Sequence, residues 1–137
     1  RSRRRSGPVA DRAAIAVGSQ TRWSRVFAVD DVRHFSEVSG DRGVHHIELD
    51  AEGRLMVQGL LTATLPTKLG GDLNYLAREM LFEFLRPVFT GDRIECVSTA
   101  TKVEKQPGRT YAEFSISCTN QAGKEVLRAG TKGVILD

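Results

Sequence analysis

The sequence has no long apolar run: no stretch approaches the roughly 18 residues of a membrane-spanning helix, which argues against an integral membrane protein. The first eight residues also lack the apolar stretch of a secretory signal. Cysteine is scarce. Cys96 and Cys118 lie 22 residues apart without Cys-x-x-Cys spacing, which argues against a zinc site or a disulfide framework and predicts two buried thiols. These features together predict a cytoplasmic protein.

Net positive charge is confined to one segment. Four of the first five residues are arginine, and removing them from the net charge of +3 leaves −1 for residues 6–137. Clustered arginines can neutralise phosphates, but a solvated extension explains this cluster more simply, so we expect no nucleic-acid partner. With 40% hydrophobic and 27% charged residues, the rest is typical of a globular protein. We predict a basic tail over 1–12 and a single domain over 13–137.

The first half of the chain combines one strand with two helices. Alternation over 21–29 predicts a half-buried strand. Asp30 and Asp31 suit the start of a helix that Ser39-Gly40 ends, and residues 41–55 form a polar loop. Apolar residues on nearly every side predict a second helix over 55–69 that is buried all round, kinked or shortened by Pro66 and ended by Gly70-Gly71.

The second half reads as four antiparallel strands, over 73–85, 94–103, 110–119 and 125–135, with turn residues between them. The clearest alternation places Phe114, Ile116 and Cys118 on one face. The fold class is therefore α+β, with a curled antiparallel sheet of about five strands around a central buried helix. A helix that is apolar all round also needs cover on its far side, which predicts a homodimer or a dimer of dimers.

Candidate catalytic groups cluster between residues 41 and 59. Asp41 and His46 lie five residues apart across a glycine-containing loop, and an acid and an imidazole can together orient and deprotonate a water. Gly59 lies near the start of the central helix, where free backbone N–H groups can stabilise a developing negative charge. The alternative interpretation of Asp41 is a turn aspartate that caps local backbone.

These residues resemble the MaoC-like acyl dehydratases, including the (R)-specific enoyl-CoA hydratases, which have the hot-dog fold. The resemblance runs roughly from residue 17 to 136 and includes Ser39-Gly40-Asp41, His46 and Gly59-Leu60-Leu61. Its most specific element is Phe84-Leu-Arg-Pro87-Val88-Phe-Thr-Gly91-Asp92, which is similar to the family signature F-x-x-P-V-x-x-G-D.

The resemblance implies a hydratase or dehydratase of fatty acid metabolism that interconverts trans-2-enoyl and 3-hydroxyacyl thioesters of coenzyme A or a carrier protein. It assigns water activation to Asp41 and His46, and binding of the thioester carbonyl to the amide of Gly59. Gln58 precedes that glycine, and Thr64 matches a small hydroxylated residue near the site. No cofactor and no metal are implied, and His45 is interpreted as the exposed neighbour of His46.

The sequence departs from the family pattern in three places. Gly43-Val44 replaces the usual Asn-Pro, Gln58 replaces a histidine, and only 11 residues separate His46 from Gln58. The shorter connection removes part of the cover expected over the acyl channel. Two other functions therefore stay open: a hot-dog acyl thioesterase, and a non-catalytic subunit that binds acyl thioesters.

Overall fold

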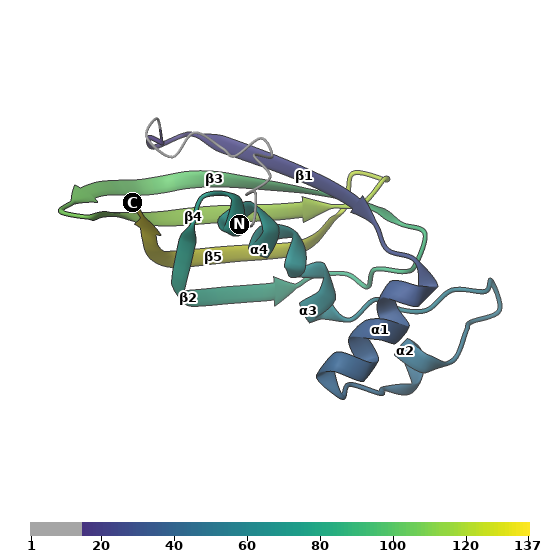
Figure 1. Cartoon of the computed structure of the whole chain (residues 1–137). Helices are drawn as coiled ribbons and strands as arrows, with labels where there is room; N and C mark the ends of the chain where they lie inside the picture. Colours follow the sequence, from purple (N-terminus) through teal and green to yellow (C-terminus); the bar gives the residue numbers. More distant parts are fainter. Residues whose placement is uncertain (1–14) are drawn as a thin grey trace, which may run out of the picture.

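The computed structural model describes residues 15–137, so the predicted basic tail over 1–12 lies outside the described residues. The strands and helices follow one another in a single sheet-and-helix assembly (Figure 1). In chain order they are β1 (Gln20–Val26), α1 (Val29–Ser39), α2 (Val44–Ile47), α3 (Gly59–Thr62), α4 (Thr64–Asp72), β2 (Tyr75–Phe84), β3 (Arg93–Gln106), β4 (Arg109–Thr119) and β5 (Glu125–Leu136).

All five strands belong to one antiparallel sheet with the order β1-β3-β4-β5-β2. Each predicted strand is present, with ends within three residues of the expected ones. The last three strands form a meander, whereas β2 pairs with β5 and not with β3, which follows it in the chain. β2 is therefore an edge strand, and its free edge lies on the side away from β5.

The alternation predicted in β4 is confirmed, because Phe114, Ile116 and Cys118 are all buried on the same face. Cys118 lies directly opposite Cys96 on β3, and both are fully buried free thiols, as the sequence predicted. This inner face of the sheet supplies much of the apolar core.

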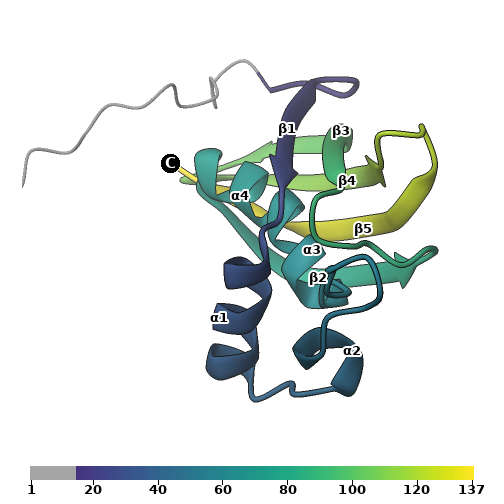
Figure 2. The same cartoon turned by 90° about the vertical axis from the view of Figure 1, so that its right-hand side faces the viewer.

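The first predicted helix is confirmed as α1, which ends at Gly40 in the left-handed region (φ 77°) where glycine is favoured. Its start is fixed by Asp31, whose carboxylate accepts hydrogen bonds from the backbone N–H of Ala28 and from Arg25. The polar loop predicted over 41–55 contains one short helix, α2, which was not predicted. Both views place α1 and α2 beyond one end of the sheet (Figures 1 and 2).

The prediction of one helix over 55–69 was wrong at both ends. Residues 55–58 are extended, because they pair with the segment after β2: Met56 forms a bridge with Phe89, and Val57 donates its N–H to Val88. The helix begins at Gly59 and continues through both glycines to Asp72, where Lys68 pairs with the Asp72 carboxylate.

The helical run is also interrupted, since α3 and α4 meet at Ala63. Pro66 lies three residues further on; it has no N–H to give the carbonyl of Thr62, and its ring crowds that carbonyl, so the predicted irregularity falls one turn before the proline. Nor is the run buried all round. Leu60 is 61% exposed, because the sheet covers only one side of the helix.

The sheet curls around the helical run α3–α4, and α4 packs against β1, β2 and β3 (Figures 1 and 2). This confirms the predicted α+β arrangement of a curled antiparallel sheet around a central helix. Within residues 15–137, no helix has both the length and the apolar character needed to cross a membrane.

Candidate active site

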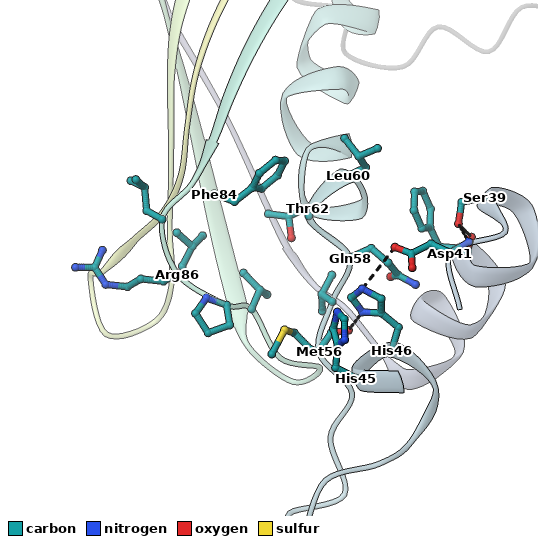
Figure 3. A pocket seen from close by; sticks show the side chains of 17 residues that line it. Ser39, Asp41, His45, His46, Met56, Gln58, Leu60, Thr62, Phe84 and Arg86 are labelled. Carbon is teal, nitrogen blue, oxygen red and sulfur yellow. Dashed lines mark hydrogen bonds and ion pairs between the residues drawn. The ribbon is translucent and has the colours of Figure 1, made fainter. Parts of the chain in front are cut away.

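An open cavity of about 680 Å³ lies where the α1–α2 segment meets the start of α3 and the end of β2 (Figure 3). Of the predicted site residues, the cavity wall contains Asp41, His46, Gln58 and Gly59. These four are separated by up to 18 positions in the sequence, and the turn from α1 into α2 and the extended segment before α3 bring them together. This size suits a small-molecule site.

His46 is almost fully buried, with 7% of its side chain exposed, and its ring is held in one orientation. Its Nδ1 lies 2.7 Å from the carbonyl oxygen of Met56. Because a carbonyl can only accept, Nδ1 carries a proton and donates this hydrogen bond. In the neutral ring the lone pair is then on Nε2. Met56 also donates its N–H to the carbonyl of His45. The extended segment that contains Met56 is therefore joined to α2 by two hydrogen bonds.

Asp41 is half-exposed and held by its own turn. The backbone N–H of Asp41 donates to Ser39 Oγ, and Asp41 Oδ1 accepts the N–H of Gly43 at 3.2 Å. The second carboxylate oxygen, Oδ2, lies 3.5 Å from His46 Nε2 (Figure 3). The geometry of the carboxylate is compatible with both interpretations, since Oδ1 caps the turn and Oδ2 faces the histidine.

Asp41 Oδ2 and His46 Nε2 are both acceptors when the histidine is neutral, so neither supplies a proton to the other. A water molecule carries two donors and can bond to both atoms at once. The pair is therefore arranged to hold a water, with the histidine lone pair and the carboxylate ready to receive a proton from it.

Gly43-Val44, which stands where the MaoC-like proteins usually have Asn-Pro, forms the start of α2. Gly43 is the N-cap residue and Val44 the first residue of the helix, a position that suits proline because its N–H has no acceptor inside the helix. A Cβ on Gly43 would lie 2.9 Å from the His45 ring. That ring packs against the ring of His46, with centroids 3.8 Å apart, so His45 also lines the cavity although it is exposed.

Gln58 stands where the MaoC-like proteins usually have a histidine. Its side chain connects α1 to the start of α3 through hydrogen bonds. Its side chain is 1% exposed, and its Nε2 donates to the carbonyl of Val32 and to Ser36 Oγ. The donation to a carbonyl fixes the orientation of the amide. Oε1 consequently has no partner among the described residues, although it is buried beside the cavity.

Gly59 is the first residue of α3, where the backbone N–H has no acceptor within the helix. A Cβ at this position would lie 2.7 Å from Cε1 of Phe84, whose ring therefore packs directly over the glycine. The N–H of Gly59 is thus next to an apolar wall, where a hydrogen bond is stronger than in water.

The structure does not bring Thr64 to the cavity wall. Its hydroxyl donates to the carbonyl of Leu61, one turn earlier in the helical run. Thr62 is on the wall instead, and its side chain is 3% exposed. The sequence does not distinguish the two threonines, because it does not show which hydroxyl donates its hydrogen bond to the helix backbone.

Among residues 15–137, no group of three His, Cys, Asp or Glu side chains is placed to hold a metal ion. The polar groups on the wall include two acceptors at Asp41 and His46 and a backbone donor at Gly59. This set suits the binding of a water beside a carbonyl group.

No protein-family model matches the chain. Over 93% of its length it is 25% identical to the mitochondrial 3-hydroxyacyl-[acyl-carrier-protein] dehydratase of Arabidopsis thaliana, of which it covers 81%. Two solved structures resemble it with a TM-score of 0.77 each. The (R)-hydratase of A. caviae involved in PHA biosynthesis is 25% identical, over 90% of this chain and 98% of that one. The unliganded R-hydratase PhaJ1 of Pseudomonas aeruginosa is 22% identical, over 91% and 84%.

A MaoC-like dehydratase also shares the architecture. The resemblance to the MaoC-like dehydratases and (R)-hydratases is therefore confirmed, and the fold is the hot-dog fold of these proteins. The matched proteins are named as hydratases and dehydratases, which agrees with the predicted class of activity. The Arabidopsis relative is a mitochondrial protein, so the cytoplasmic location of this chain stays a prediction.

Proposed function

We propose that the protein is an enoyl-thioester hydratase, or 3-hydroxyacyl-thioester dehydratase, with Asp41 and His46 as its catalytic pair. One observation carries the proposal: Asp41 Oδ2 and His46 Nε2 face each other at 3.5 Å on the wall of a cavity, while the ring proton of His46 is engaged by Met56. This leaves two acceptors with no proton between them.

In the hydration direction, one water donates a hydrogen bond to each member of the pair. Its oxygen forms the new bond to C3 of the enoyl thioester as one of its protons passes to the pair, and a proton from the pair is then delivered to C2. Dehydration is the reverse: the pair removes the C2 proton and protonates the leaving 3-hydroxyl. Water is the only other reactant, and no electrons are exchanged, so the reaction needs no redox cofactor.

Negative charge develops on the thioester oxygen as the bond to C3 forms. The N–H of Gly59 is proposed to donate a hydrogen bond to this oxygen, beside the apolar ring of Phe84. Gln58 binds no proton in this scheme. Its amide holds α1, and thereby the turn of Asp41, against the start of α3.

The proposed substrate is a thioester of an acyl carrier protein, which the name of the Arabidopsis relative contains, or of coenzyme A, which the sequence resemblance implies. The two buried thiols fit a reducing compartment such as the cytoplasm.

We further propose that two copies join through β2 and that each site lies near this interface. β2 is an edge strand, and it carries exposed apolar side chains that a stable monomer would rarely leave in water. These exposed side chains are Leu76, Met80, Leu81, Phe84 and, just beyond the strand, Leu85. Phe84 and Leu85 also line the cavity, so a second copy would cover part of it. Light scattering that shows a stable monomer at micromolar concentration would refute the dimer.

The experiment that tests the function follows crotonyl-CoA, and the same acyl group on a carrier protein, after addition of the pure chain. Loss of the ultraviolet absorbance of the enoyl thioester, without release of free thiol, supports hydration. Thiol release would indicate a thioesterase. Thermal stabilisation by the thioester with neither signal would indicate a non-catalytic binding subunit, and either of these outcomes would refute the proposal.

A further inference from the structure

Three threonines in the helical run α3–α4 differ in what their hydroxyls do. Thr64 donates its hydroxyl to the carbonyl of Leu61, and Thr67 donates to the carbonyl of Ala63, as hydroxyls inside helices commonly do. The hydroxyl of Thr62 has no hydrogen-bond partner among the described residues, although the side chain is 3% exposed.

An unpaired buried hydroxyl is costly, and few are found in folded proteins. Thr62 lies on the cavity wall, and in Figure 3 its hydroxyl points into the cavity between Phe84 and Gln58. A ligand in the cavity would therefore lie against the Thr62 side chain, whose hydroxyl is still free to form a hydrogen bond.

The position of Thr62 relative to Gly59 indicates which ligand atom it reaches. Residues three apart share one face of a helix, and helical side chains lean towards the N-terminus. The hydroxyl of Thr62 therefore leans back towards the end of α3 where the free N–H of Gly59 lies. Two donors on one turn of a helix beside one cavity suit a single oxygen acceptor.

We propose that the Thr62 hydroxyl is a second hydrogen-bond donor to the thioester carbonyl oxygen, alongside the backbone N–H of Gly59. This inference rests on the proposed function for the identity of the ligand. The Phe84 ring packs over Gly59, and an apolar neighbour strengthens a hydrogen bond to a carbonyl oxygen that gains negative charge.

The decisive variant is Thr62→Val, which keeps the shape of the side chain and removes only the hydroxyl. With crotonyl-pantetheine, which contains the arm shared by coenzyme A and carrier proteins, we expect kcat to fall by roughly 100-fold with little change in KM, as for loss of one oxyanion donor. The melting temperature should stay the same or rise, because the valine buries no unpaired polar atom. Thr62→Ser should restore most of the lost turnover.

Thr67→Val is the matched control on the same helical run, since its hydroxyl is already bonded to the backbone. It should keep kcat and lower the melting temperature slightly. If Thr62→Val behaves in this way as well, with normal turnover and reduced stability, its hydroxyl serves the helix and the inference is overturned.

A readout without turnover separates the inference from the proposed function. Isotope-edited infrared spectroscopy of butyryl-pantetheine with a ¹³C carbonyl, which cannot be hydrated, should show a lower carbonyl stretching frequency on the wild-type protein than on Thr62→Val. If the wild type shows this difference but does not hydrate crotonyl-pantetheine, the inference holds and the hydratase proposal fails. If butyryl-pantetheine does not bind the wild type, both are refuted.

Discussion

The sheet and the α1–α2 segment, residues 29–58, are held together in different ways. The sheet is a continuous ladder of five strands over an apolar core, in which residues such as Ile94 and Cys96 are fully buried. The α1–α2 segment lies beyond the end of the sheet (Figure 1). It adds Val32, Leu55 and Val57 to the same core and is otherwise mostly exposed, with specific hydrogen bonds such as those of Gln58 to α1 and of His46 to Met56. Most of the apolar core, and with it most of the stability, therefore lies in the sheet, whereas the proposed catalytic pair lies in the segment.

The largest effect that would sharpen this separation is expected from Asp41→Asn. The side chain is half-exposed, so the variant should remain folded. An amide cannot take the proton of water, and loss of the acid–base group should reduce kcat by roughly 100- to 10,000-fold. Steady-state hydration of crotonyl-CoA measures the loss, and circular dichroism serves as the folding control. Near-full activity on every thioester would favour a binding module over a hydratase.

Gly59→Ala is expected to have the second largest effect on turnover. A loss of about 100-fold is expected, because a Cβ obstructs the approach of the thioester to the N–H of this residue. The Cβ would also meet the Phe84 ring. The double variant Gly59→Ala/Phe84→Leu separates the two causes: it should stay impaired if the Cβ obstructs the thioester. Restored turnover would instead assign the glycine to packing against Phe84.

Ile94→Ala tests the other side of the comparison. Ile94 is fully buried in β3 and is not on the cavity wall. Truncation should lower the free energy of unfolding by about 2–5 kcal/mol. Denaturant titration measures this loss, while kcat at a temperature where the variant is folded should be unchanged. A large fall in kcat would contradict the separation between sheet and segment.

His45→Ala should have the smallest effect. The ring lies against that of His46, but the carbonyl that accepts the N–H of Met56 belongs to the backbone and is kept. We expect turnover within about tenfold of the wild type, since no general acid–base group is lost. If His45→Ala were inactive and His46→Ala active, His45 would be the catalytic histidine and the proposed role of His46 would be wrong.

The sheet was the more predictable region, because alternation along one strand reports which face is buried. The pattern of Phe114, Ile116 and Cys118 placed β4 correctly without knowledge of its neighbours. The position of β2 beside β5 was not predictable, since strand order depends on pairing between distant segments. The start of the central helix was predicted wrongly for the same reason. Leu55 and Val57 fit a helix as well as a strand, and only pairing with residues 88–90 selects the extended form.

Four residues of the predicted site, Asp41, His46, Gln58 and Gly59, line one cavity, and their roles stay predictions. The motif missed Thr62 and expected Thr64, because a sequence does not show which hydroxyl bonds to the helix backbone. It also could not show that Met56 fixes the proton on Nδ1 of His46, since this contact joins two segments through a backbone carbonyl.

The most direct test of the central claim, that Asp41 and His46 hold one water as a unit, is the kcat/KM of Asp41→Asn, His46→Ala and the double variant in the same hydration assay. Groups that act as a unit lose their effect together. The double variant should therefore be about as active as the worse single variant. Losses that multiply, or a single variant with wild-type activity, would contradict the claim.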